Sequence, residues 1–208
     1  MVTNTARPRL ARKTLASLTL LALAASLAGL GAWATFTSTV SQSQTLASGT
    51  VTIALGATGA ATNRLNIGAS NLAAGDTVQR AVNLTNSGSI SLASITLTTT
   101  ASPSTLLDTD ATNGLQMVID KCSVAWTEGG TAPAYTYTCG GTTSTVVASR
   151  AVIGSGLTLS NLGILSSTGT DYLRVTLTLP SGAGNTLQNL SSTITYSFTA
   201  TQRNATNA

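Results

Sequence analysis

The side chains that most often carry catalysis are scarce in this chain. Its 208 residues include no histidine, two cysteines and six acidic residues. The Ser-His-Asp and Cys-His arrangements and the HExxH zinc motif all need histidine, so the composition excludes them. No serine lies in the G-x-S-x-G turn that presents a nucleophile between a strand and a helix. The sequence therefore predicts no catalytic residue, no metal ligand and no cofactor.

Asp108 and Asp110 are the acidic pair whose spacing deserves a test against metal chemistry. They flank Thr109, and their carboxylates could contribute oxygen ligands to Ca²⁺ from a loop. The residues that follow lack the spacing of an EF-hand, and two carboxylates are few for a hard cation. We favour the simpler interpretation, in which both aspartates cap a solvated turn.

Residues 1–34 have the pattern of a helical signal peptide. Four basic residues precede a Leu/Ala-rich run, and Ala32 and Ala34 are the small residues of a cleavage site at its end. We expect cleavage between Ala34 and Thr35, by a signal peptidase during export. The alternative is an uncleaved anchor, because the apolar run over 14–36 approaches the ~20 residues that span a bilayer. Either outcome places the protein outside the cell, secreted or at the cell surface.

The charge balance excludes nucleic acid as an expected partner. The chain has ten basic and six acidic residues and a formal net charge of +4, but four of the basic residues belong to the leader. The remainder is neutral overall, so no basic stripe is left to bind phosphates. We expect membrane contact only through an uncleaved leader. A neutral surface also gives little repulsion between copies, which favours self-association.

Cys122 and Cys139 are the only cysteines in the chain. An even pair behind an export signal is most simply one disulfide, because the compartments outside the cytosol are oxidising. Closing a loop of this size stabilises a fold by roughly 3 kcal/mol in the chain-entropy model. A zinc site is a poor alternative, since two thiolates without any histidine are too few ligands.

Alternating apolar and Ser/Thr residues recur over 50–202 and predict one antiparallel β-domain. Gly, Asn, Asp and Ser separate the alternating stretches at regular intervals, as turns do. No stretch after the leader has a helical stripe, so we expect an all-β jelly-roll or β-sandwich. The clearest rows expected to be buried are Leu173, Val175, Leu177 and Leu179, and Ile194, Tyr196 and Phe198.

Three features depart from the regular alternation. Arg80 interrupts an apolar row, so we expect it at a sheet margin with its charged end in water. The apolar phase changes near Ala93 and Ser94, which predicts a β-bulge. The last residues, 203–208, are polar and are expected to form a flexible tail.

Three blocks of the chain resemble a known bacterial family when taken in order. The first is the cleavage region 31–38, which leads to Leu46-Ala47-Ser48-Gly49-Thr50-Val51. The second is Asn71-Leu72-Ala73-Ala74-Gly75-Asp76, with Asn86-Ser87-Gly88-Ser89 after it, and Ala74 stands where proline is usual. The third runs from Asp171 to Pro180 and continues through 187–202. Together they resemble the TasA/camelysin (CalY) family of exported proteins, least so over 100–157.

The resemblance implies a jelly-roll domain that is exported with the signal peptidase SipW and assembles into fibres of the biofilm matrix. In such fibres the N-terminal strand of one subunit completes a sheet of the next, by donor-strand exchange. In this chain that strand falls within 35–49, with 35–46 as its core and Phe36 and Val40 as its anchors. Two alternatives remain: a camelysin-like metalloendopeptidase at the cell surface, although its ligands are missing from the sequence, and a monomeric surface adhesin.

Overall fold

The computed structural model describes residues 48–166 and 168–204. The chain divides into two units, 1–46 and 47–208, and only the second contains described residues. The expected signal peptide, its cleavage site and the anchors Phe36 and Val40 therefore lie outside the described residues. Within the described part, no helix is both long and apolar enough to cross a membrane.

The first sheet contains five antiparallel strands in the order β1-β2-β9-β4-β7. Along this order the strands are β1 (Ile53–Leu55), β2 (Thr77–Asn86), β9 (Gly169–Thr178), β4 (Gln116–Cys122) and β7 (Thr143–Ala151). Strands far apart in the sequence are neighbours here, so the chain leaves this sheet and returns to it.

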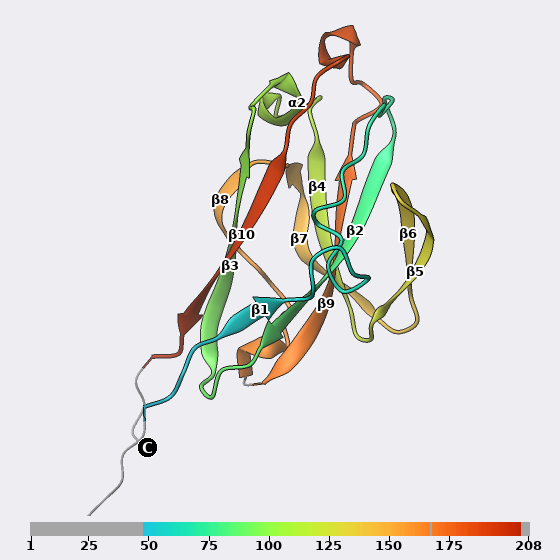
Figure 1. Ribbon diagram of the computed structural model, residues 1–208. Helices are drawn as coiled ribbons and strands as arrows, with labels where there is room; N and C mark the ends of the chain where they lie inside the picture. Colours follow the sequence, from blue (N-terminus) through green and yellow to red (C-terminus); the bar gives the residue numbers. More distant parts are fainter. Residues whose placement is uncertain (1–47, 167, 205–208) are drawn as a thin grey trace, which may run out of the picture. The chain divides into compact units, whose positions relative to one another are not determined.

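The second sheet contains three antiparallel strands in the order β10-β3-β8. They are β10 (Ile194–Gln202), β3 (Leu92–Ala101) and β8 (Gly154–Thr158). The chain crosses between the sheets from β2 to β3, from β3 to β4 and from β7 onward to β10, and the two sheets face each other (Figure 1). The fold is therefore the antiparallel, all-β sandwich of jelly-roll type that the alternation predicted.

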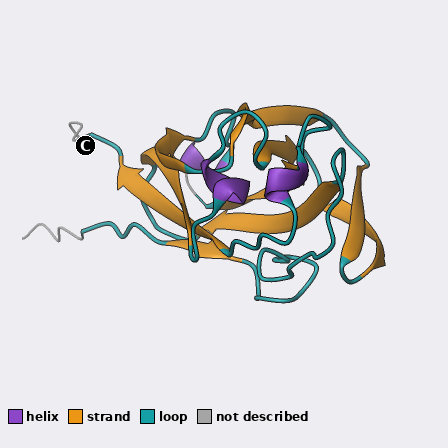
Figure 2. Ribbon diagram, turned by 90° about the horizontal axis from the view of Figure 1, so that it is seen from above, coloured by secondary structure: helices purple, strands orange, loops and turns teal. Residues whose placement is uncertain are grey.

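Smaller elements lie at the ends of the sandwich and beside it. The strands β5 (Trp126–Thr131) and β6 (Ala134–Cys139) form a separate hairpin next to β2 and β9 (Figure 1). A short helix, α2 (Leu106–Thr109), and two 3-10 turns, η1 (Ile164–Ser166) and η2 (Asn185–Leu187), are the helical elements drawn in Figure 2.

The alternating residues form the core because each strand points every second side chain between the sheets. Leu84 of β2, Leu97 of β3 and Leu173 of β9 are fully buried. Burying one such side chain contributes about 1.5–3 kcal/mol, so the leucine and valine rows stabilise the sandwich without many aromatic residues. The predicted bulge is confirmed: Thr201 pairs with Ser94 and Gln202 with Leu92, which leaves Ala93 unpaired.

The two open sides of the sandwich differ. On one side, β7 ends at Ala151 and β8 begins at Gly154, and the Ser160 N–H donates to the Val146 carbonyl across the margin. On the other side, β1 and β10 are the terminal strands of their sheets, and no backbone hydrogen bond joins them within the described residues. Any site between the sheets is therefore reached from the β1 and β10 side.

Candidate functional site

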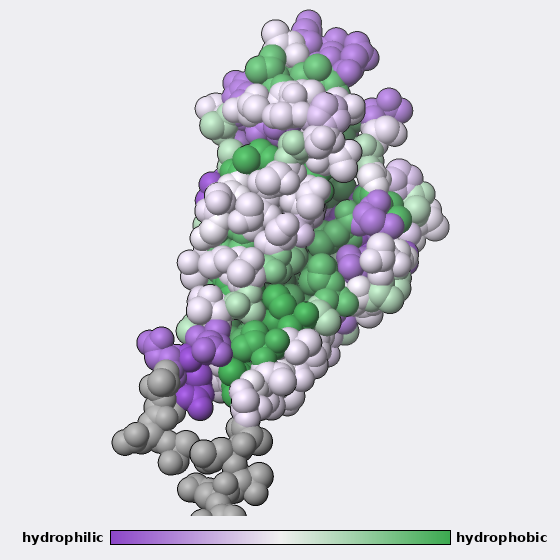
Figure 3. Space-filling model, turned by 60° about the vertical axis from the view of Figure 1, so that its left-hand side comes forward, coloured by the Kyte–Doolittle hydropathy of each residue, from purple (hydrophilic) through white to green (hydrophobic). Residues whose placement is uncertain are grey.

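A groove opens between β10 and the margin formed by β1 and β2. It consists of two adjoining hollows, one of about 880 Å³ and one of about 140 Å³, and Tyr196 lines both. We call the two hollows together the edge groove. Apolar side chains gather in a band on the face of the molecule shown in Figure 3, and Leu55, at the small hollow, is 38 % exposed.

The strand β10 gives the groove an unpaired backbone edge. Its hydrogen bonds run to β3 on one side, and the described residues provide no backbone partner on the other. Ile194, Tyr196 and Phe198 point inward as the alternation predicted, but each is only half-buried. The row expected to be buried therefore faces the core but is only partly covered, because no strand of the described chain covers β10 on that side.

The segment 65–72 forms the opposite wall and covers the outer edge of β2. Arg80 of β2 holds it: Nε donates to the Ile67 carbonyl at 2.6 Å and Nη2 to the Gly68 carbonyl at 3.0 Å. A third bond runs from Nη1 to the Gln79 carbonyl at 2.6 Å. Arg80 is only 5 % exposed, so the expectation that its charged end reaches water was wrong. Three backbone carbonyls replace the water.

Arg80 and Tyr196 form a polar centre in a groove whose remaining lining mixes leucines with polar side chains such as Asn66 and Asn71. Burial lowers the pKa of Arg80. Burial also raises the pKa of Tyr196, and the positive charge of Arg80 offsets only part of that rise. Among the described residues, Arg80 has no carboxylate partner and the Tyr196 hydroxyl makes no hydrogen bond. A group that enters the groove at this level finds a cation and a free hydroxyl.

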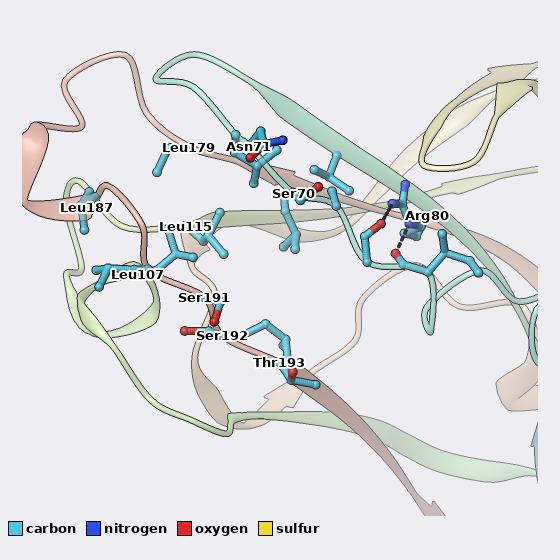
Figure 4. Close-up of a pocket in the computed structure, with 18 of the residues that line it drawn as sticks. Ser70, Asn71, Arg80, Leu107, Leu115, Leu179, Leu187, Ser191, Ser192 and Thr193 are labelled. Carbon is cyan, nitrogen blue, oxygen red and sulfur yellow. Dashed lines mark hydrogen bonds between the residues drawn. The ribbon is translucent and has the colours of Figure 1, made fainter.

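The wide end of the groove is lined by leucines, at a distance from Arg80 (Figure 4). The leucines labelled there are Leu107, Leu115, Leu179 and Leu187. Asp108 of α2 connects two segments at this end of the groove. Its carboxylate accepts hydrogen bonds from the hydroxyls of Ser192 and Ser104 and from the Thr105 N–H. Burial acts to raise the pKa of Asp108, but these donors outweigh it and hold the pKa below its usual range.

Asp108 and Asp110 have structural partners that account for both carboxylates. Asp108 is the N3 residue of a capping box whose N-cap is Thr105, and it is 3 % exposed. The carboxylate of Asp110 accepts the N–H groups of Thr112 and Asn113, each at 2.9 Å. The turn interpretation fits Asp110, whereas Asp108 is a buried helix cap rather than a solvated residue.

The narrow end of the groove is built on the turn from Asn86 to Ser89. Asn86 is 1 % exposed, donates to the Ile164 carbonyl and accepts the Gly88 N–H. The Ser89 hydroxyl accepts the Thr50 N–H at 2.9 Å, and the Ser89 N–H donates to the Thr50 carbonyl. This turn therefore fixes the first described residues of the chain beside β2.

The hairpin supports the 65–72 wall from outside. Arg64 Nη2 and Nε lie 2.6 and 2.9 Å from the two oxygens of Glu128, and Tyr137 donates its hydroxyl to Glu128 at 2.9 Å. The Arg64 guanidinium also lies 4.6 Å from the centre of the Tyr135 ring. Arg64 is the first cause of the lowered pKa of Glu128, and burial is the first cause of the rise of the Tyr137 pKa to about 12.

Cys122 and Cys139 form a disulfide that closes the hairpin onto β4, with Cα atoms 5.7 Å apart. Trp126 packs under the guanidinium of Arg174, 4.4 Å from its ring centre, and donates Nε1–H to the Tyr172 carbonyl. The aromatic residues of this loop therefore dock the hairpin on the sheet.

The residues of this chain do not fit a catalytic metal. All six acidic residues and both cysteines are among the described residues, and histidine is absent from the sequence. The described part contains no group of three such side chains close enough to hold an ion. The carboxylates of Glu128, Asp120 and Asp171 are instead paired with Arg64, Arg174 and Lys121, in that order.

The sequence did not indicate the edge groove itself. Its walls come from 65–72, β2, α2 and 187–196, which are far apart in the chain. The one available signal was Arg80, a charged residue within an apolar row, which marked the centre of the groove although its burial was not foreseen.

Comparison with known proteins agrees with the resemblance of the sequence blocks. A family model described as camelysin metallo-endopeptidase matches residues 9–207, nearly the whole chain. A search of curated proteins gives no significant match. The chain belongs to the camelysin family, the TasA-type family of exported proteins.

Proposed function

We propose that this protein is a secreted structural subunit that assembles into extracellular filaments of a biofilm matrix by donor-strand exchange. Membership of the family supports secretion. The observation that carries the assembly mechanism is the edge groove, a partly apolar channel beside the unpaired edge of β10. Its occupant is the segment 35–46 of another copy, released when the leader is removed after Ala34.

The segment has the chemistry that such a groove accepts. In an extended conformation Phe36, Ser38 and Val40 lie on one face, and the intervening residues are threonines. An added strand gains affinity from main-chain hydrogen bonds to the open edge and specificity from alternate side chains in the groove. Burying Phe36 and Val40 contributes about 1.5–3 kcal/mol each.

The residues of this chain support assembly into filaments better than they support a metalloendopeptidase or a monomeric adhesin. A metalloendopeptidase needs ligands that this chain does not contain. A monomeric adhesin would leave exposed an unpaired strand edge together with the apolar side chains of the groove, a combination that soluble proteins usually cover. Filaments, on the other hand, use both features.

Deleting 35–46 tests the proposal. The exported full chain is expected to form filaments in electron microscopy, and the deleted form is expected to remain a folded monomer. A matched pair of variants separates the two faces of the strand: Phe36→Asp with Val40→Asp should abolish filaments, whereas Thr37→Asp with Thr39→Asp should preserve them. Filaments from the deleted form, or equal loss in both double variants, would contradict donor-strand exchange.

A further inference from the structure

We infer that the strand that fills the edge groove lies antiparallel along β10, comes from a second copy, and is held in one register by Ser38 opposite Tyr196 and Arg80. This inference rests on the proposed function and specifies its geometry. It names the acceptor edge, the direction of the strand and the residue pairs in contact.

The acceptor edge is β10 and not β2. The outer edge of β2 already has partners: β1 pairs with Leu84 to Asn86, the Thr62 carbonyl accepts the Asn83 N–H, and the Arg64 N–H donates to the Ala81 carbonyl. Arg80 holds 65–72 over the remainder. An incoming strand would have to displace these bonds at β2, whereas β10 offers its backbone groups without any displacement.

Direction follows from the rest of the fold. Every strand pair in the described part is antiparallel, and an antiparallel pair is slightly more stable per residue than a parallel one. Antiparallel addition to β10 places Phe36 at the narrow end of the groove, near Phe198. The end of the segment at Leu46 then lies at the wide end, among the leucines.

This direction requires a second molecule. In its own domain, the chain enters at the narrow end, where the Thr50 N–H is bound by Ser89. The strand β10 spans about 30 Å at ~3.3 Å per residue. Leu46 of the same chain is only four residues from Thr50, so it cannot lie at the wide end. A copy stacked beyond the wide end can place its own Leu46 there.

The polar centre selects the register. A strand can slip by two residues and keep the same face inward, so apolar packing alone does not distinguish three neighbouring registers. Only one of them places Ser38 opposite Tyr196, with Phe36 opposite Phe198 and Val40 opposite Ile194. A slip in either direction places Phe36 or Val40 beside the Tyr196 hydroxyl and the charge of Arg80. These two polar groups then gain no hydrogen-bond partner from the added strand.

The small and large hollows fit this register. Phe36 enters the hollow formed by Ile53, Leu84 and Phe198. Val40 points toward the apolar side chains of the larger hollow, such as Val78 and Leu177. The following Gln42 reaches the polar stretch 191–193 at the groove mouth.

Cysteine pairs on the outward face test the register without changing the groove. In this register Thr37 lies directly opposite Ser197, and Thr195 and Thr199 are the diagonal neighbours; all three β10 positions are exposed. Thr37→Cys is combined with Ser197→Cys, Thr195→Cys or Thr199→Cys in the exported full chain. Diagonal neighbours in antiparallel pairs are about 7–8 Å apart, beyond the range of an unstrained disulfide.

The pair at 37 and 197 is expected to give a ladder of covalent multimers in non-reducing gels, about tenfold more than either diagonal pair. Adding Ser38→Val is expected to spread the cross-links over all three positions, because the polar centre no longer selects one register. A strongest ladder at 195 or 199, or equal ladders before Ser38 is changed, overturns the register.

The remaining outcomes separate this inference from the proposed function. Cross-linked monomers without multimers overturn the second copy as the donor. Filaments that form without a cross-link at any of the three positions overturn β10 as the acceptor edge and leave donor-strand exchange intact. Absence of filaments from the unsubstituted chain contradicts the proposed function, and the register with it.

Discussion

Glu128 is the residue through which the β5–β6 hairpin holds the wall of the edge groove. Its two oxygens bind the guanidinium of Arg64, at the start of that wall, and one of them also accepts the Tyr137 hydroxyl. The side chains of Arg64 and Glu128 are each 18 % exposed, so water screens the pair less than it screens a fully exposed pair. The contact between the hairpin and the wall therefore depends on the charge of one carboxylate, whereas Arg80 holds the wall from the β2 side.

Glu128→Gln is expected to lower the free energy of unfolding by about 1 kcal/mol at neutral pH, because the amide loses the charge-assisted part of both contacts. The pKa of Glu128 is lowered in the folded state, first by the hydrogen bond from Arg64. Its contribution is thus present above the unfolded pKa and is lost as the pH falls through the folded one. Urea denaturation at neutral and acidic pH should show a smaller difference between variant and unsubstituted protein in acid. If the difference in unfolding free energy stayed constant or grew in acid, the charge of Glu128 would not be the source of the stabilisation.

At the scale of elements, the strands were predictable from the sequence because one local rule, alternation, determines them. The rows on β2, β9 and β10 follow that rule, and the bulge at Ala93 is visible as a break in its phase. The strands β5, β7 and β8 were not predicted individually, and in β8 Gly154 and Gly156 leave almost no apolar row. The helix α2 has only four residues, too few to show a helical period.

The groove could not be predicted for a different reason. It depends on which strands end each sheet, and β1 and β10 face each other only after the chain has crossed the sandwich several times. The burial of Arg80 depends likewise on carbonyls of Ile67 and Gly68, which are not distinguishable from other loop carbonyls in the sequence.

The contact between the Asn86–Ser89 turn and the start of the chain gives an element-scale prediction. A Cβ on Gly88 would lie 2.4 Å from the Thr50 carbonyl oxygen and 2.9 Å from the Thr52 nitrogen. Gly88→Ala is therefore expected to push 50–55 away from β2 and to cost about 1–3 kcal/mol of stability. Urea denaturation would measure the loss of stability, and faster hydrogen exchange over β1 would show the displacement.

Gly184→Ala is the matched control, because nothing lies within 4 Å of its added Cβ and its φ of −87° suits alanine. It should leave both measurements nearly unchanged. If Gly88→Ala behaved in the same way, the turn would not fix the start of the chain at the narrow end, and a strand of the same chain could then reach the groove.

At the scale of the whole molecule, the proposed strand leaves the domain at the narrow end of one groove and enters the next groove at the wide end. Such a contact uses different surfaces on the two partners, and it generates an open filament unless the rotation closes into a ring. The overall neutrality of the chain behind the leader favours this arrangement, because stacked copies repel each other little.

The same charge distribution predicts that filament growth depends only weakly on salt. The segment 35–46 has no charged residue, and Arg80 is the only charged residue that lines the groove in the described part of the chain. Raising the salt from ~0.01 M to ~1 M shortens the Debye length from about 30 Å to about 3 Å, which weakens contacts between exposed charges and leaves apolar burial and main-chain hydrogen bonds in place. Growth followed by light scattering should change less than about threefold over this range. A loss of more than about tenfold would mean that exposed charges hold the subunits together, and the groove would then not be the main contact.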